Sequence, residues 1–289
     1  MKQLIRGLAK PIVRRARTWL EPPPVKVVDR WCTISAGPAE GADILLPYPS
    51  GFADKIVPGQ YEIPCTSIMQ ALVSRDSVCL DIGGHYGYFT LVLASLAPEG
   101  RVETFEPLPN HAKRIADSAD RSGLAHVKVH QKAVADISST MTLRYVSSGN
   151  YDSMAYLESR GGVVSEASKE QYPTFESCTV ETTTLDALSP LEPSFIKVDA
   201  EGAEAAILRG GTNLLANQKP RLLIEIHGIR EAFECAEVLR DVGYQVFAIG
   251  EPDTTLPVLC LSSEDPIAKQ TVDQALHPAL TMIFNDQSR

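Results

Sequence analysis

The stretch VCLDIGGHYGYFT, residues 78–90, decides the fold of this chain. It begins as a hydrophobic strand, continues into a glycine-rich turn and then enters a helix. The spacing Asp81-x-Gly83-x-x-x-Gly87 places a carboxylate at the carboxyl end of the strand. It also places glycines where the backbone passes close to a ligand, since a residue without Cβ leaves that room. The stretch therefore predicts a strand–turn–helix unit with a ligand at the end of the strand.

A second acidic residue, Glu106, ends the next predicted strand, residues 101–106. An acidic side chain at this position can accept hydrogen bonds from the hydroxyls of a ribose. We therefore expect a cofactor that contains a nucleoside, lying across the first two strands of an α/β sheet.

The glycine spacing distinguishes two cofactor classes. A dinucleotide site needs G-x-G-x-x-G, whereas Gly83 and Gly84 are adjacent here and no third glycine follows in register. Asp81 and Glu106 would repel phosphate but suit S-adenosylmethionine, which is net cationic. We expect S-adenosyl-L-methionine; the alternative is a tight βαβ turn that binds no ligand.

Three later segments occur in a specific order: TTLD at 183–186, FIKVDAEGAEAAILRGG at 195–211 and KPRLLIEIH at 219–227. Together with residues 60–62 and 105–107, this series resembles the FkbM-type methyltransferases, over residues 60 to 250. The resemblance implies the Rossmann-like class I methyltransferase fold, with a mostly parallel seven-stranded sheet and helices on both faces. It also implies S-adenosylmethionine-dependent O-methylation. One departure is Gly84, where many relatives carry Ala.

The alternation of strand and helix patterns independently predicts a parallel sheet covered by helices. It runs over residues 78–134 and resumes at 195, with one helix at 203–216. Residues 281–285 are expected to supply the last strand, inserted antiparallel. Between the two stretches of alternation lies an irregular insertion, residues 137–188, with strands at 141–146 and 178–184. We expect this insertion to cover the carboxyl edge of the sheet.

We divide the chain into a methyltransferase domain at 61–289, a cap or linker at 25–60 and a basic amphipathic helix at 1–24. Short β-like runs at 25–34 and 43–48 suggest an antiparallel cap. Residues 1–20 carry six Lys or Arg and no acid. Such a helix is suited to peripheral contact with an anionic membrane, or to packing on its own domain or a partner subunit.

The net charge of −9 argues against a nucleic-acid partner, because phosphate binding needs a basic surface. No apolar run is long enough to span a bilayer. The scattered cysteines are interpreted as reduced thiols, and the protein as cytoplasmic, with peripheral contact at the membrane as an alternative. The oligomeric state is not predicted.

The base that deprotonates an acceptor hydroxyl must lie at the carboxyl edge of the sheet. His227, which ends the fifth strand, is the leading candidate, since imidazole titrates near neutral pH; the alternative is a structural histidine. Asp199 and Glu201 point the same way along their strand and are candidates to orient the acceptor or act as base. Alternatively, Glu201 and Glu204 only favour the start of the next helix. Lys197 is expected to be buried beside Asp199.

Catechol-type methyltransferases bind Mg²⁺ through acids at the ends of the fourth and fifth strands, where this chain has Asp199 and Glu225. The pattern offers no third ligand, so we predict no metal. His111, His126, His130 and His277 have no partner pattern and are expected at the surface. The expected cofactor contacts are Glu62, Asp81, Gly83, Gly84, His85, Tyr86, Gly87, Glu106, Pro107 and Asp199.

The sequence thus favours an O-methyltransferase that acts on a small hydroxylated acceptor, first of all a sugar or glycan precursor. A polyketide or other secondary metabolite is the second choice of acceptor. A protein that binds S-adenosylmethionine without catalysis, as a partner in an assembly, is the non-enzymatic alternative.

Overall fold

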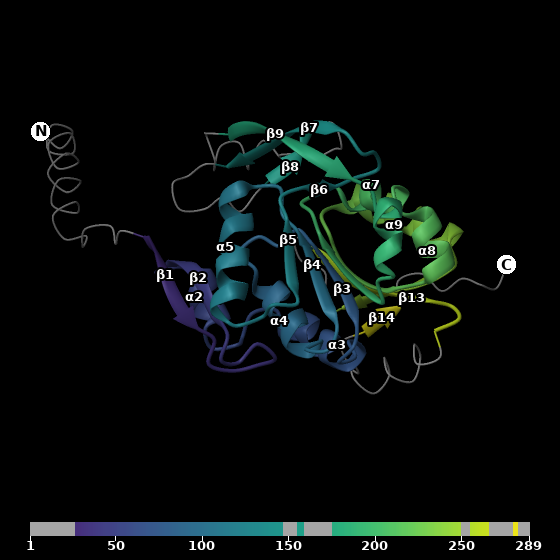
Figure 1. Ribbon diagram of the computed structural model, residues 1–289. Helices are drawn as coiled ribbons and strands as arrows, with labels where there is room; N and C mark the ends of the chain where they lie inside the picture. Colours follow the sequence, from purple (N-terminus) through teal and green to yellow (C-terminus); the bar gives the residue numbers. More distant parts are fainter. Residues whose placement is uncertain (1–26, 147–154, 159–174, 250–254, 266–279, 283–289) are drawn as a thin grey trace, which may run out of the picture.

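The computed structural model describes residues 27–146, 155–158, 175–249, 255–265 and the backbone of 280–282. A central twisted sheet carries helices on both faces, and a smaller sheet lies across one end of it (Figure 1). The predicted helix at 1–24, much of the insertion and residues 283–285 of the predicted last strand lie outside the described residues.

The central sheet is mixed but mostly parallel, as expected. Its order is β14 (Leu280–Met282), β12 (Tyr244–Ile249), β13 (Leu256–Ser262), β11 (Arg221–Ile226), β10 (Phe195–Asp199), β3 (Val78–Ile82), β4 (Arg101–Phe105) and β5 (Val127–His130). The strands from β11 to β5 are parallel, and β13 runs antiparallel between β11 and β12. Seven strands thus form the predicted sheet, and β14 adds an eighth at its edge.

The last strand, β14, is antiparallel as predicted, but it lies at the edge of the sheet beside β12. The antiparallel strand inserted inside the sheet is β13, so the predicted inserted position was wrong. An interior strand is covered on both faces and needs an almost continuous hydrophobic run. Val258–Leu261 supply that run and are completely buried, whereas β14 pairs only with the outer edge of β12.

The two faces of the sheet are covered by different helices. α3 (Ile63–Leu72) and α4 (Tyr88–Leu96) pack in one hydrophobic cluster, and α7 (Glu204–Arg209), α8 (Thr212–Gln218) and α9 (Ile229–Asp241) in the other. The single helix expected at 203–216 is divided into α7 and α8 at Gly210 and Gly211. A Cβ at Gly210 would lie 2.2 Å from the carbonyl oxygen of Ala135, so the close approach of this neighbouring segment requires glycine.

The insertion forms a four-stranded sheet of its own. Its order is β6 (Ala133–Val134), β9 (Phe175–Thr183), β7 (Thr140–Val146) and β8 (Ala155–Leu157). The two strands predicted there correspond to β7 and β9. β6 follows β5 in the chain but leaves the central sheet to pair with β9. A 3-10 helix, η2 (Asp186–Leu191), leads back to β10. Leu143 and Leu157 of this sheet reach the carboxyl edge of the central sheet.

The cap is a hairpin, β1 (Val28–Thr33) and β2 (Asp43–Tyr48), followed by α2 (Gly51–Ile56). The hairpin agrees with the expected antiparallel cap. Its second strand, β2, lies along α5 (Pro109–Arg121). The backbone N–H of Asp43 donates to Ser122 Oγ at 2.9 Å, and that of Leu45 to Ser118 Oγ at 3.2 Å. Helix hydroxyls therefore take the place of a further strand. Within the described part of the chain, no helix has both the length and the apolar character to cross a bilayer.

Candidate active site

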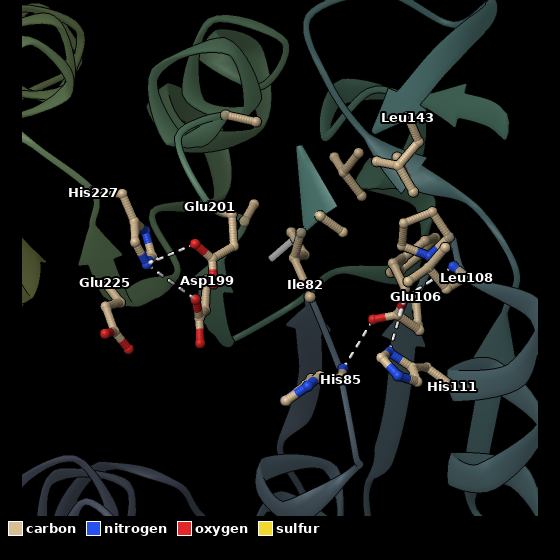
Figure 2. Close-up of a pocket in the computed structure, with 18 of the residues that line it drawn as sticks. Ile82, His85, Glu106, Leu108, His111, Leu143, Asp199, Glu201, Glu225 and His227 are labelled. Carbon is tan, nitrogen blue, oxygen red and sulfur yellow. Dashed lines mark hydrogen bonds and ion pairs between the residues drawn. The ribbon is translucent and has the colours of Figure 1, made fainter. Parts of the chain in front are cut away.

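A cavity opens at the carboxyl ends of β3, β4, β10 and β11 (Figure 2). Its walls come from these strand ends, from the segments around α2 and α3, and from the insertion sheet. Of the residues singled out from the sequence, it is lined by Glu62, Gly83, His85, Glu106, Pro107, Asp199, Glu201 and His227. Asp81, Gly84, Tyr86 and Gly87 lie behind this wall and shape it.

Gly83 allows the ends of β3 and β10 to approach each other. Its φ is +85°, and a Cβ there would lie 1.8 Å from the carbonyl oxygen of Asp199. Gly84 is also enclosed, since its Cβ would meet side-chain atoms of Thr104 and Ile115 at 2.5 and 2.7 Å. An alanine at this position would therefore require those two side chains to move.

Asp81 is fully buried beneath the turn, where its Oδ2 accepts a hydrogen bond of 2.6 Å from the Thr90 hydroxyl. Within the described residues its Oδ1 has no hydrogen-bond partner, and Lys197 Nζ lies 4.0 Å away. Lys197 is itself buried, 3.1 Å from Asp199 Oδ2 and over the ring of Phe89. Burial alone would lower the pKa of Lys197, but the Asp199 and Asp81 carboxylates raise it above its ordinary value. The predicted pairing of Lys197 with Asp199 is confirmed.

Glu106 is held by two backbone groups at the end of β4. The N–H of His85 donates to its Oε2 and the N–H of Leu108 to its Oε1, both at 2.9 Å (Figure 2). Burial raises the pKa of Glu106 to about 7. The carboxylate thus has a fixed position on the cavity wall, and a hydroxyl group that donates to it would favour its charged form.

His111 was expected at the surface, and this expectation was wrong. It lies in the first turn of α5, is 2% exposed and lines the cavity, with its ring 5.0 Å from that of His85. Burial lowers the pKa of His85 to about 4 and that of His111 to about 3, so both rings are neutral at physiological pH. Helical spacing could have revealed His111, because it shares a buried face with Ile115 and Ala119.

Two further histidines also differ from the surface prediction, because each has a partner inside the fold. His126 Nε2 lies 3.0 Å from the carbonyl oxygen of Ala94, and His130 pairs with the buried Glu103. His277 lies outside the described residues.

His227 is surrounded by carboxylates. Its Nδ1 lies 2.9 Å from Glu204 Oε1. Its Nε2 lies 3.9 Å from Asp199 Oδ1 and 3.7 Å from Glu201 Oε2 (Figure 2). Burial alone would lower the pKa of His227, but these carboxylates raise it to about 10. At neutral pH the side chain is therefore a cation that shares its charge with three acids.

The same side of the cavity holds further acids. Glu225 pairs in register with Asp199 across β10 and β11. Glu62, the residue before α3, also lines the cavity. Burial raises the pKa of Glu201 and of Glu225 to about 7, and neighbouring carboxylates add to the effect; the pKa of Glu62 is also raised by burial. Among the described residues, no group of three or more His, Cys, Asp or Glu side chains is arranged to hold a metal ion.

The cavity therefore has two chemically different ends. One is apolar and adjoins Glu106; it is lined by Phe105, Val134, Leu143 and Leu157. The other is anionic and contains Asp199, Glu201, Glu225 and His227. A planar base with its ribose fits the first end, and a cationic group fits the second. Gly83 between them lets the backbone pass close to a ligand, so the residues present fit S-adenosylmethionine.

Comparisons with known proteins are consistent with this arrangement. Residues 81–246 match the model of a protein family described as the methyltransferase FkbM domain. Methyltransferase 1 of Beauveria bassiana (strain ARSEF 2860) is 23% identical over 194 residues, which cover 64% of this chain and 78% of that protein. The family match begins at Asp81 in the glycine turn and ends at Val246 in β12, so it includes all four strand ends around the cavity.

Solved structures of other methyltransferases also align with the chain. The FkbM methyltransferase of Methylobacillus flagellatus KT has a TM-score of 0.47 and 17% identity, over 65% of this chain and 44% of that chain. This chain thus spans less than half of the length of that protein. TYW2 of M. jannaschii, solved in complex with AdoMet, has a TM-score of 0.45 and 12% identity, over 83% of this chain and 87% of that chain.

Proposed function

The chain belongs to the FkbM family of S-adenosylmethionine-dependent methyltransferases, and we propose that it methylates a hydroxyl group of a small acceptor. A sugar or glycan precursor is the favoured acceptor. The observation that carries the proposal is the anionic end of the cavity, where a histidine and three carboxylates lie within reach of a bound hydroxyl. Carboxylates and imidazole are the groups that accept protons from alcohols and hydrogen-bond to sugar hydroxyls.

The cofactor contacts follow from the position of each residue. We assign the ribose hydroxyls to Glu106, next to Pro107, and the close backbone approach to Gly83, Gly84 and Gly87. Asp81 and His85 with Tyr86 would support the methionine end, and Glu62 and Asp199 would face its positive charges. When bound, S-adenosylmethionine supplies the methyl group and a sulfonium charge.

For the acceptor, we propose His227 as the base and Asp199 and Glu201 as the groups that orient the hydroxyl. His227 would accept the proton of the acceptor hydroxyl, and Asp199 and Glu201 would hold its oxygen towards the methyl group. The bound cofactor would supply that methyl group and keep the electron pair of its carbon–sulfur bond on sulfur. His227 must be neutral to accept that proton. A positive charge placed beside Asp199 and Glu201 would oppose their effect on His227 and lower its pKa from about 10.

The location remains a proposal that rests on the sequence. We propose a cytoplasmic protein whose basic residues 1–20 make peripheral contact with membranes. The acidic composition supports partners other than nucleic acid.

Calorimetry with S-adenosylmethionine and with NAD tests the cofactor assignment directly. We expect heat of binding and a saturable 1:1 isotherm with S-adenosylmethionine, and none with NAD, because the anionic cavity end repels a diphosphate. Binding of NAD in place of S-adenosylmethionine would contradict the proposed function as a whole.

Glu106→Gln should weaken the binding of S-adenosylmethionine by about 1.5–3 kcal/mol, the scale of hydrogen bonds to a charged group. The substitution keeps the size of the side chain and removes its charge. Glu103→Gln is the matched control, because Glu103 lies on the same strand and is equally buried, but pairs with His130 away from the cavity. Calorimetry on both variants gives the comparison. Equal affinities in the two variants would place the ribose elsewhere.

A further inference from the structure

Glu204 is a buried carboxylate at the first position of α7, and its only hydrogen-bonded side chain among the described residues is His227. The residue is 0% exposed, and its Oε1 lies 2.9 Å from His227 Nδ1. The same oxygen accepts hydrogen bonds from the backbone N–H groups of Gly202, at 3.0 Å, and Ala200, at 3.3 Å. The other oxygen, Oε2, is buried without a hydrogen-bond partner in the described structure.

This burial is unfavourable unless a positive charge offsets it. A buried carboxylate without a cationic partner costs several kcal/mol, and within the described part of the chain no Lys or Arg lies within 4.0 Å of Glu204. His227 is the only cation that the structure gives it. A residue that served only to start α7 could lie at the surface, as most acids at helix N-termini do.

The other acids near His227 are placed differently. Asp199 and Glu201 face Nε2 rather than Nδ1, at 3.9 and 3.7 Å, which is beyond hydrogen-bond distance. Asp199 is also engaged by Lys197 at 3.1 Å. Both Asp199 and Glu201 line the cavity, whereas Glu204 does not. The two ring nitrogens of His227 therefore face two different environments.

We propose that Glu204 is the positioning residue of the active site: it binds His227 through Nδ1 and leaves Nε2 facing the cavity to receive the proton of the acceptor hydroxyl. This inference rests on the proposed role of His227 as the base. A hydrogen bond at one ring nitrogen determines which nitrogen carries the proton in the neutral ring. Glu204 Oε1 accepts a hydrogen bond from Nδ1–H and so keeps the hydrogen on Nδ1. The neutral ring therefore has its free electron pair on Nε2, on the side of Asp199 and Glu201.

The charged groups that face the imidazole are Glu204 on α7 and Asp199 and Glu201 at the end of β10, while Glu225 precedes it on β11. Glu204 is the one in direct hydrogen-bond contact. Removing the Glu204 carboxylate should therefore have the largest effect on the pKa of His227. The residues that line the cavity stay the same, because Glu204 is not one of them.

Nuclear magnetic resonance of the full chain labelled with ¹⁵N-histidine tests the proposal without any acceptor, and His227→Gln identifies the signals of His227. In the wild type we expect His227 to titrate near pH 10 and its neutral form to carry hydrogen on Nδ1. In Glu204→Gln the pKa should fall by roughly 1–3 pH units. Glu231→Gln is the control, since Glu231 is also buried and bonded to α7, through the N–H of Ala205, but does not contact His227.

Glu204→Gln keeps an oxygen that can accept from Gly202 and Ala200, so the variant is expected to fold. If it does not, the wild-type measurement still decides, because a neutral ring with hydrogen on Nε2 would overturn the proposal. An unchanged pKa of His227 in folded Glu204→Gln would overturn it too. Calorimetry of the wild type with S-adenosylmethionine separates the two claims, because absence of binding there contradicts the proposed function and not the role of Glu204.

Turnover supplies a second readout once an acceptor is in use. If Glu204 acts through His227, the pH at which the rate reaches half its maximum should move towards acid in Glu204→Gln by the same interval as the pKa. A merely structural role would lower the rate by one factor at every pH. That result would overturn the proposal.

Discussion

Replacing His227 by alanine should lower turnover by about 10²–10⁴-fold, the range for the loss of a general base. The affinity for S-adenosylmethionine should remain nearly unchanged, because we assign His227 to the acceptor and not to the cofactor. In the wild type, the rate should increase with pH above neutrality, since the carboxylates around His227 keep it protonated there. It should level off before pH 10, because the positive charge of the bound cofactor lowers the pKa of His227. Steady-state rates between pH 6 and 10, together with calorimetry for the cofactor, measure both effects.

An acceptor with an acidic hydroxyl, such as a phenol, provides the internal control for this variant. Such a nucleophile needs less help from a base, so the loss in His227→Ala should shrink. If His227→Ala keeps full activity at every pH, the imidazole is not the base, and Asp199 or Glu201 becomes the better candidate. A loss of cofactor binding of the same size as the loss of rate would instead indicate a structural role.

Replacing Gly83 by alanine should have the largest effect on the fold. The added Cβ would lie 1.8 Å from the carbonyl oxygen of Asp199 and 2.9 Å from its carbonyl carbon, and these are backbone atoms that cannot turn away. The positive φ of +85° adds strain for any residue with a side chain. We expect a loss of about 3 kcal/mol or more in the free energy of unfolding. The binding of S-adenosylmethionine should be lost as well, because the ends of β3 and β10 would separate.

Gly41→Ala is the matched control. Gly41 has almost the same backbone conformation, with φ +87°, but an added Cβ there would meet no atom within 4 Å. Its cost should be limited to backbone strain, about 1–2 kcal/mol, and cofactor affinity should not change. Urea unfolding and calorimetry on both variants give the comparison. Equal losses in the two would show that the strand ends are not packed as closely as described.

The sequence predicted the central fold because the fold depends on local patterns. The alternation of strands and helices and the glycine turn at 81–87 are contained in short segments. The parallel strands, and the carboxyl ends at which the site lies, could therefore be predicted. The position of β13 could not, since an inserted strand is defined by its neighbours β11 and β12 rather than by its own sequence. For the same reason, the sequence could not show that the strand predicted at 281–285 lies at the edge of the sheet rather than inside it.

The candidate site was predictable in its composition but not in its charges. Motif spacing placed Asp199, Glu201 and His227 at one edge, because parallel strands end together. The pKa of His227 depends on Glu204, which belongs to the next helix and had only a helix-start interpretation. The helical spacing of His111 indicates only that it lies on the buried face of α5, whereas its contact with His85, in the turn after β3, is contained in no local pattern.

The serine hydroxyls of α5 have a consequence for self-association. The outer edge of a hairpin strand exposes N–H groups to which another polypeptide chain can add as a new strand. On β2 these groups belong to alternate residues, 43, 45 and 47. Ser122 and Ser118 occupy the first two, and the third is Pro47, which has no N–H to offer. Two hydroxyls and one proline thus close this edge of β2, so a further strand cannot add to the hairpin on the side of α5.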